Sequence, residues 1–446
     1  MTTDRTTVLR HPRAFPYELR SFPSRLEDGE VPGRLLQWIQ AAVFGFYGEA
    51  PDPEDMRKFV ESEQVDGRVV VGAYLVGTET PAGAWDASIP VATYAYHRKD
   101  LNVGAPARLP VHMITAVTVR ASHRRRGILR AMITSDLAQA KAAGLPMAAL
   151  TASEAVIYGR FGFGTATHHC SVEVAAKGGL VFQNAAAAHS GVVEVAEPAV
   201  VADLHDDVFA RVHAGTYGSI GRQDLYRSIV SGQGGYEHPK KDPAVRAALH
   251  YDAAGGVDGY VTYKVDERDP AGPTAKVVDV LAVDSSAYLA LWNYLGSLDL
   301  IERVTWTEAP ENDPLEWAIV NKRDYRRTET EDHLWLRILD VPRSLSARRY
   351  WADGELTLHV TDPLGHVSGT YRISVAAGAA TVLVVDEDDD ADLALGVAEL
   401  SSLYFGNVLA HTLAAAGRVR EQRAGALAEF DLLFGSPVRA HSLTDF

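Results

Sequence analysis

The stretch VTVRASHRRRGILRAM, residues 117–132, carries the strongest indication of fold in this chain. It begins as an apolar, β-branched run, passes through the consecutive basic residues His123–Arg126, and then continues beyond Gly127 as an amphipathic pattern. These patterns predict a strand, a basic loop and a helix. The first turn of a helix exposes unpaired N–H groups, and its dipole favours negative charge there. A glycine also lets a ligand approach the backbone closely. We therefore expect an anion-binding site whose ligand is a diphosphate.

A simpler explanation of the basic loop stays open at this point. The formal net charge is -15, so the guanidinium groups of Arg124, Arg125 and Arg126 could pair with surplus acids or form a solvated patch. On charge alone the simpler explanation is preferable, because Arg-x-x-Gly is a short motif. The forked donors of arginine, however, match the oxygens of a phosphate. The strand before the loop and the long helix after it favour the anion site.

Composition limits the class of protein. A chain of 446 residues with 47% apolar residues is too long for one core and predicts two or three domains. No run approaches the roughly 20 apolar residues of a membrane span, and residues 1–20 lack the apolar core of a signal peptide. The single cysteine, Cys170, indicates a reducing compartment, so we expect a cytoplasmic protein. The acidic balance argues against binding of nucleic acid and favours a cationic partner.

The order of predicted elements indicates an α+β fold with mixed sheets. Residues 17–65 are predicted to be helical. The strands and helices predicted after them are strands at 68–78, 89–99 and 111–120, a helix at 127–143, a strand at 147–153, a short helix and turn at 154–164, and a strand at 167–174.

The next segment repeats this order faintly. It contains a hairpin at 246–265, a strand at 275–284, a serine-capped helix at 285–301 and a strand at 302–310. Where the first copy has RRRGIL, the second has VDSSAYL, without basic residues or glycine. We therefore expect that the second copy binds no diphosphate.

A third segment follows, with a hairpin at 356–377, a strand at 380–388 and helices within 391–416. The acidic run that begins at Asp386 is predicted to be a loop and the start of a helix, where negative charge is favourable. The predicted domains are residues 1–175, 176–335 and 336–446.

Two motifs together carry a resemblance to a known family. HRRRGILRAM (123–132) and AALTASEAVIYGRFGFG (148–164) resemble the GNAT acyltransferases, whose Arg/Gln-x-x-Gly-x-Gly/Ala loop holds the pyrophosphate of acetyl-CoA. Leu129 departs from this pattern at its sixth position. A bulky residue there resembles the Eis (enhanced intracellular survival) family of acetyltransferases. ALWNYLGSLDLIERVTW (290–306), DHLWLRILDVPRSLSARRY (332–350) and the terminal Phe446 extend the resemblance over most of the chain. It implies two tandem GNAT domains, the second degenerate, followed by a sterol-carrier-like domain.

The resemblance also implies roles for individual residues. The strand Val117, Thr118 and Val119 would pair with the pantetheine arm through main-chain groups, and the same run can equally be a core strand. Ser153 and Glu154 would lie near the thioester. Tyr158 would be the general acid and the carboxylate of Phe446 the general base. The residues of the pyrophosphate loop would be Arg124, Arg125, Arg126, Gly127, Ile128, Leu129 and Arg130.

Other candidate residues carry less information. Trp38, Phe44, Phe46 and Tyr47 could line a substrate cleft or belong to a core. The nearby acids, Asp52, Glu54 and Asp55, could hold amines or simply lie at the surface. No metal site is predicted, because the neighbouring side chains of His168, His169 and Cys170 alternate in direction along a strand.

The leading hypothesis is an acetyl-CoA-dependent N-acetyltransferase that modifies amines of polycationic small molecules such as aminoglycosides, at several positions and by direct transfer. The resemblance also implies a homohexamer. One alternative is an N-acetyltransferase for lysines of proteins or peptides. Another is a non-catalytic regulator that binds acyl-CoA or lipid.

Overall fold

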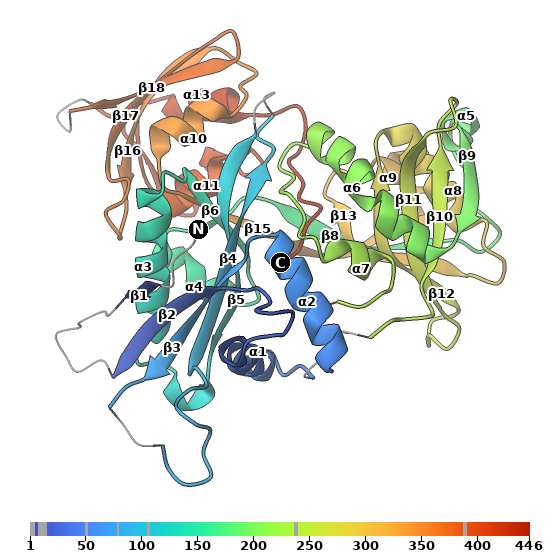
Figure 1. Ribbon diagram of the computed structural model, residues 1–446. Coiled ribbons are helices and arrows are strands. Elements are labelled where there is room, and N and C mark those ends of the chain that lie inside the picture. Colours follow the sequence, from blue (N-terminus) through green and yellow to red (C-terminus); the bar gives the residue numbers. More distant parts are fainter. Residues whose placement is uncertain are drawn as a thin grey trace.

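The computed structural model describes residues 5–7, 16–49, 52–77, 80–104, 108–235, 240–386 and 390–446. Three β-sheets, each covered by helices, form three lobes (Figure 1). The predicted α+β architecture with mixed sheets is confirmed.

The first sheet carries the stretch with which the sequence analysis began. Its strands, in spatial order, are β1 (Arg5–Thr7), β2 (Tyr17–Pro23), β3 (Val69–Leu75), β4 (Ala92–Leu101), β5 (Leu109–Val119), β6 (Met147–Thr151), β15 (Leu334–Ile338) and β7 (Gly164–Thr165). Helices α1 (Gly33–Gly45) and α2 (Pro53–Val65) cover one face, and α3 (Ile128–Ala142) covers the other. Alternation along β4 explains this, since Tyr94 packs with α3 whereas Ala95 packs with α1 and α2.

The second sheet repeats the arrangement. Its strands, in spatial order, are β14 (Tyr325–Asp332), β8 (His168–Ala175), β13 (Arg303–Pro310), β12 (Thr274–Ala282), β11 (Val257–Asp266), β10 (Arg246–Tyr251) and β9 (Val192–Ala196). Helix α8 (Ser285–Gly296) covers one face, with α5 (Ala185–Ala188) and α9 (Pro314–Ala318) beside it. Helices α6 (Pro198–Gly215) and α7 (Tyr226–Val230) cover the other.

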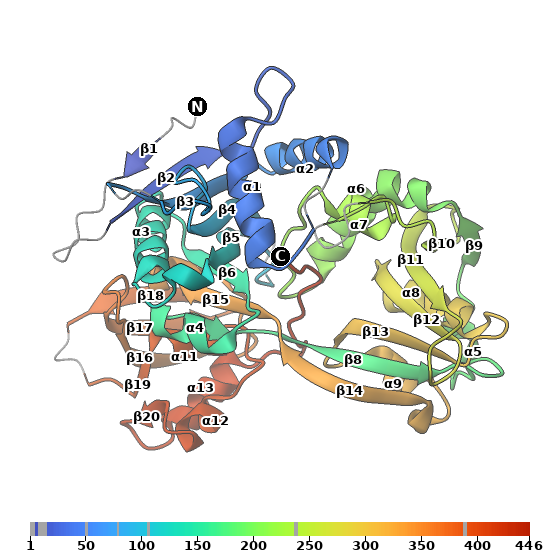
Figure 2. The same cartoon turned by 90° about the horizontal axis from the view of Figure 1, so that it is seen from below.

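The chain exchanges strands between these two sheets. β8 follows the first sheet in sequence but pairs with β13 and β14 of the second sheet. β15 follows the second sheet but returns to pair with β6 and β7 of the first. Figure 2 shows β8 and β14 running side by side from the centre of the molecule into the second lobe. The predicted boundary at 175 thus falls after β8, and the boundary at 335 falls inside β15, so neither follows sheet membership.

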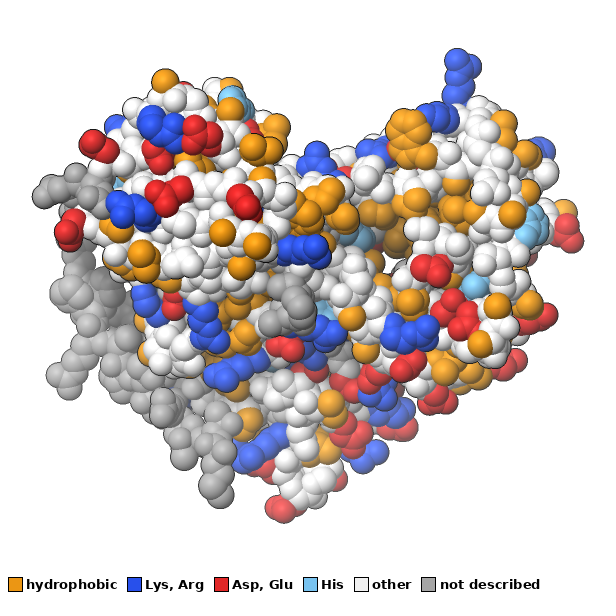
Figure 3. Space-filling view, turned by 90° about the horizontal axis from the view of Figure 1, so that it is seen from above, with side chains coloured by type: hydrophobic (Ala, Val, Ile, Leu, Met, Phe, Trp, Pro, Cys, Tyr) orange, Lys and Arg blue, Asp and Glu red, His pale blue; other side chains and the backbone are white. Residues whose placement is uncertain are grey.

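The third sheet has the order β18-β17-β16-β19-β20. Its elements are α10 (Val341–Ala347), β16 (Gly354–Thr361), β17 (Gly369–Ala376), β18 (Ala379–Val385), β19 (Leu393–Gly396), α11 (Val397–Leu403), α12 (Ala410–Ala415), β20 (Val419–Glu421) and α13 (Ala426–Phe434). A Cβ atom on Gly164 of β7 would lie 2.0 Å from the carbonyl oxygen of Ala398 in α11, so only glycine permits this packing between first and third lobes. From above, the surface is hollowed between two lobes, and hydrophobic side chains gather there (Figure 3).

Three local predictions were wrong. Residues 17–23 form strand β2 rather than helix, because Tyr17 and Leu19 are buried on one face of the sheet and Phe22 is buried on the other. The cap of α8 is Asp284, whose carboxylate accepts from the N–H groups of Ser286 and Ala287 at 2.8 and 2.9 Å. After the acidic run, of which 387–389 lie outside the described residues, the chain forms β19 before α11.

Candidate functional site

A gap between two parallel strands defines the site. β5 and β6 pair only from Val111 to Met113, although both strands continue further. The pairing of β5 with β4 has an irregularity at the same level, where Ala116 has a φ of 52°. Such a bulge bends its strand and strengthens the local twist, which separates β5 from β6. Val117–Val119 therefore pairs with β4 on one side and with no described strand on the other.

Two residues with positive φ shape the basic loop that follows this open part of β5. Arg125 has a φ of 62°, and Gly127, which caps α3, has a φ of 80°. Left-handed backbone conformations in a turn direct neighbouring N–H groups to one side, which suits an anion. The first turn of α3, Ile128–Arg130, adds N–H groups without helical partners. A Cβ atom on Gly127 would meet nothing within 4 Å, so this glycine serves backbone conformation rather than close packing.

The arginines of the loop divide into two pairs. Arg124 donates from Nε to the carbonyl oxygen of Val119 at 3.2 Å, and Arg126 donates to the hydroxyl of Tyr17 at 3.2 Å and the carbonyl oxygen of Ser122 at 3.0 Å. Arg125 and Arg130 have no side-chain hydrogen bond or ion pair within the described part of the chain, and both are exposed. The first pair shapes the loop and the second is free to bind, so the residues fit a diphosphate.

Tyr158 lies beyond the end of β6. Ser153 and Glu154 are exposed in the turn after β6, and α4 (Ala155–Tyr158) then brings the tyrosine ring into the core. The ring packs edge-on against Phe163, with centroids 6.0 Å apart. Burial raises the pKa of Tyr158 to about 12. The phenol is thus a protonated donor at neutral pH.

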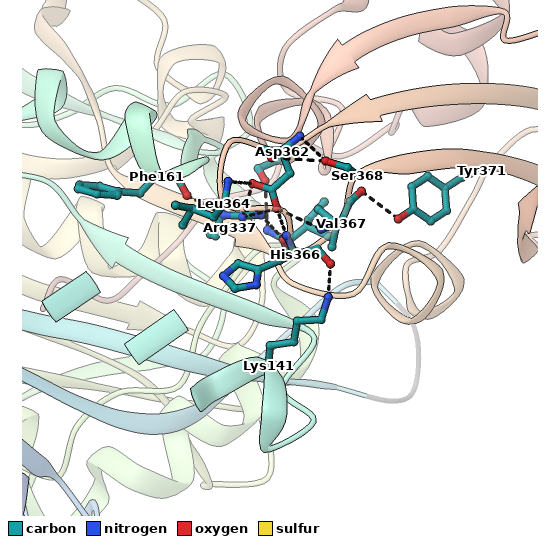
Figure 4. Close-up of polar contacts among 11 residues, drawn as sticks. Lys141, Phe161, Arg337, Asp362, Leu364, His366, Val367, Ser368 and Tyr371 are labelled. Carbon is teal, nitrogen blue, oxygen red and sulfur yellow. Dashed lines mark hydrogen bonds and ion pairs between the residues drawn. The ribbon is translucent and has the colours of Figure 1, made fainter. Parts of the chain in front are cut away.

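A buried ion pair holds the turn that follows Tyr158. The guanidinium of Arg337, on β15, donates from Nε to the carbonyl oxygen of Phe161 at 2.8 Å and pairs with both carboxylate oxygens of Asp362 at 2.8 and 2.7 Å (Figure 4). Neither side chain has exposed surface. Asp362 lies in the hairpin of the third lobe and also accepts from the N–H groups of His366 at 2.8 Å and Val367 at 3.1 Å. The third lobe therefore supports the tyrosine turn.

The chain's last residue lies at the end of β6. The N–H of Phe446 donates to the hydroxyl of Thr151 at 3.2 Å, and that hydroxyl donates to a main-chain oxygen of Phe446. The segment from His441 to Thr444 is largely buried, and it runs between the first and second lobes (Figure 1). The structure thus brings the terminal residue to the same strand end as Ser153, Glu154 and Tyr158.

The other candidates take varied places. Trp38 is a core residue whose indole donates to the carbonyl oxygen of Val71 at 2.8 Å. Phe44, Phe46 and Tyr47, by contrast, are 52%, 54% and 88% exposed. Of the nearby acids, Asp52 caps α2, whereas Glu54 and Asp55 belong to the first turn of that helix.

Sequence reasoning missed the residues that support the site. The bulge at Ala116 and the buried Arg337 carry no motif in a single sequence. Arg222 and Tyr226 also contact the terminal segment, and they belong to the second lobe. A weak signal existed for Arg337 alone, because it is an arginine within the apolar segment LWLRIL (334–339). No group of His, Cys, Asp and Glu suited to a metal exists in the part of the chain that the structure describes.

Three family models match the chain. Residues 40–166 and 218–338 each match a model of an acetyltransferase (GNAT) domain, and residues 341–442 match a sterol carrier protein domain. The predicted tandem GNAT domains and the sterol-carrier-like third domain are confirmed.

Two relatives match the chain over most of its length, and both are N-acetyltransferases by name. An uncharacterized N-acetyltransferase of Streptomyces griseus is 34% identical over 410 residues, which are 91% of this chain and 95% of the relative. N-acetyltransferase Eis of Mycobacterium tuberculosis is 32% identical over 430 residues, 94% of this chain and 98% of that protein.

Solved structures share the fold over nearly the whole chain. The crystal structure of Eis1 from Mycobacterium abscessus has a TM-score of 0.74 at 25% identity and covers 92% of this chain and 96% of its own. A GCN5-related N-acetyltransferase from Kribbella flavida has a TM-score of 0.71 at 22% identity, with coverage of 97% and 100%.

Proposed function

Because the chain belongs to the Eis family of acetyl-CoA-dependent N-acetyltransferases, we propose that it acetylates amines of polycationic small molecules such as aminoglycosides, at more than one position. The proposal adds the substrate class and the site residues to the activity of the family. One observation supports the proposed site: the main chain of Phe446 is hydrogen-bonded to the hydroxyl of Thr151 at the end of β6. The terminal carboxylate thus lies beside the gap in which an acetyl group would arrive.

In the proposed mechanism the residues of this chain move two protons. Acetyl-CoA supplies an activated acetyl group, with its diphosphate held by the loop that contains Arg125, Gly127 and Arg130. The carboxylate of Phe446 takes the proton that the attacking amine loses. Tyr158 donates a proton to the departing thiolate, and its raised pKa, about 12, keeps it protonated beforehand. No protein nucleophile is required, since the single cysteine, Cys170, is buried in β8 of the second sheet.

The charge of the chain supports a cationic acceptor. Its net charge is -15, and the exposed side chain of Asp445 lies next to the terminal carboxylate. A cleft lined by charge of one sign concentrates ligands of the opposite sign. An amine carrying several positive charges therefore fits better than a neutral amine.

The test is acetylation of defined amines. The purified protein, incubated with acetyl-CoA and either an aminoglycoside, a polyamine or a basic peptide, is followed by thiol release and mass spectrometry. We expect aminoglycoside products with one or more added acetyl groups. Modification of the peptide's lysines alone would refute the proposed substrate class.

The site assignment has its own test. We expect that Tyr158→Phe and a short peptide extension after Phe446 each lower kcat by about a hundredfold or more, as is usual for loss of an acid or base. Binding of acetyl-CoA, measured by calorimetry, should change little in both. Full activity in either variant would refute the role of the altered group.

Two further parts of the proposal concern the whole protein. We propose a homohexamer, from the resemblance to the Eis family, and light scattering in solution tests it. We also propose a cytoplasmic location, because the single cysteine suits a reducing compartment. No described helix is long and apolar enough to cross a bilayer.

A further inference from the structure

A buried arginine of the second lobe contacts the terminal segment. Arg222 lies between α6 and α7 and is 7% exposed. It donates from Nε and from one terminal nitrogen to the carbonyl oxygen of Leu443, at 3.0 and 2.7 Å. Leu443 lies three residues before the chain end, so the arginine acts on the segment that carries the terminal carboxylate.

Every N–H group of this guanidinium has an acceptor. Besides the two bonds to Leu443, it makes a bidentate pair with Asp279, at 2.7 and 2.8 Å, and a longer contact of 3.5 Å with the hydroxyl of Tyr260. Tyr260 in turn donates to Asp279 at 2.6 Å. An arginine has five such donors in a rigid fork, and a lysine has three around a point charge.

Two aromatic rings lie close to the guanidinium. Its central carbon lies over the rings of Phe209 and Tyr226, at 5.1 and 4.4 Å from their centroids. Tyr226 also contacts the tail directly, because its hydroxyl accepts from the N–H of Asp445 at 2.6 Å and donates to the carbonyl oxygen of the same residue at 3.1 Å. The hydroxyl of Thr444 adds a bond to the carbonyl oxygen of Ile220 at 2.9 Å. Residues 443–445 are thus held by the segment 220–226.

This contact lies where the second lobe repeats the gap of the first. β12 and β13 pair only from Thr274 to Lys276, as β5 and β6 pair over three residues. An irregularity in the pairing of β12 with β11 directly precedes Asp279, as the bulge at Ala116 precedes the open part of β5. In the first lobe the gap is open, whereas in the second the side chain of Asp279 holds Arg222 against the tail.

We propose that Arg222 is a positioning residue that clamps the terminal segment, so that the degenerate second GNAT domain presents the carboxylate of Phe446 to the active site of the first. The inference rests on the proposed role of that carboxylate as general base. Arg222 is held in place by Asp279, Tyr260 and the two aromatic rings, and it binds the carbonyl oxygen of Leu443.

The test compares Arg222→Ala with Arg227→Gln in the full-length protein. Arg227 is a matched control, because it lies on the neighbouring helix α7, is half-exposed and pairs with Asp206 and Asp224 rather than with the tail. Hydrogen exchange of the amides of residues 441–446 reports the clamp, and steady-state kinetics with acetyl-CoA and an aminoglycoside report its catalytic consequence.

In Arg222→Ala we expect tail amides to exchange about ten- to a hundredfold faster and kcat to fall by a similar factor, the size expected when a charged hydrogen bond is lost. The KM for acetyl-CoA should stay unchanged, because the loop at Gly127 is not touched. Added methylguanidinium should restore part of kcat and of the protection. Arg227→Gln should match the native protein in every measurement.

The outcomes separate two failures. Unchanged exchange of the tail amides in Arg222→Ala would overturn the clamp, whatever happens to kcat. Faster exchange with unchanged kcat would instead refute the role of the carboxylate, on which this inference rests. Should Arg222→Ala fail to fold, Arg222→Lys provides the same test, because it keeps a positive charge beside Asp279 but lacks the fork that reaches both Asp279 and Leu443.

Discussion

Replacement of Asp362 by asparagine should destabilise the protein far more than a similar change at the surface. The side chains of Asp362 and Arg337 have no exposed surface, and each carboxylate oxygen lies within 2.8 Å of the guanidinium. Asparagine keeps the shape but removes the charge, which leaves a buried, unpaired guanidinium. Breaking such a pair costs about 3–5 kcal/mol. Because the cores of the first and third lobes merge, we expect a cooperative unit of at least roughly 150–250 residues, for which this cost corresponds to about 6–20 °C in Tm.

Differential scanning calorimetry measures this effect, with Glu399→Gln as the control. Glu399 pairs with Arg418 in the same lobe, but that arginine is 51% exposed, so the control should lose less than about 1 kcal/mol. A loss of Tm in Asp362→Asn no larger than in the control would refute the argument. Because Arg337 also bonds to the carbonyl oxygen of Phe161, we expect kcat to fall with little change in acetyl-CoA binding.

The effect should also depend on pH in a defined direction. Burial alone would raise the pKa of Asp362, but the guanidinium of Arg337 lowers it by a larger amount. The pKa of Asp362 therefore lies below its ordinary value of 3.8. A carboxylate with a lowered pKa contributes stability that is fully present above its unfolded value and is lost as the pH falls through the folded value. The difference in Tm between native protein and Asp362→Asn should therefore be constant at neutral pH and shrink below about pH 4.

Three further outcomes follow from single sites. Arg125→Gln should raise the dissociation constant of acetyl-CoA, measured by calorimetry, about tenfold without changing Tm. The control Arg160→Gln, which alters an exposed arginine near Tyr158, should change neither quantity. Equal affinity for acetyl-CoA in both variants would contradict the diphosphate site. Gly127→Ala should lower the free energy of unfolding, measured in urea, by only about 1–2 kcal/mol, because the φ of 80° is strained for alanine but nothing lies within 4 Å of the new Cβ atom. The same variant should bind acetyl-CoA more weakly. Binding as tight as in the native protein would contradict the role of the backbone at this position. Burial, with a contribution from Asp445, raises the pKa of Glu308 to about 8. The Tm of the native protein should therefore decline relative to that of Glu308→Gln as the pH rises from about 5 to 8. Parallel curves of Tm against pH for the two proteins would contradict this.

The local chemistry of the site could be predicted from the sequence. The β-branched run before Arg120 and the periodicity of residues 128–142 predicted a strand and a helix joined by a basic loop, and the structure has β5 and α3 joined by that loop. That the loop binds an anion stays a prediction. These features depend on side-chain alternation, backbone freedom and helix dipoles, which act over a few neighbouring residues. The resemblance to the Eis family added Tyr158 and Phe446, whose roles stay predictions.

Only the tertiary structure decided how distant segments meet. The exchange of β8 and β15 could not be predicted, because an apolar strand of the same pattern can pair in either sheet. The bond from Arg222 to Leu443 joins residues 221 positions apart, and nothing in the neighbourhood of either residue specifies the other. Closing so long a loop costs conformational entropy, which burial and hydrogen bonds of the whole fold offset together. The sequence alone therefore determined the strand, basic loop and helix that we propose hold a diphosphate, and the packed fold determined which chain end lies beside them.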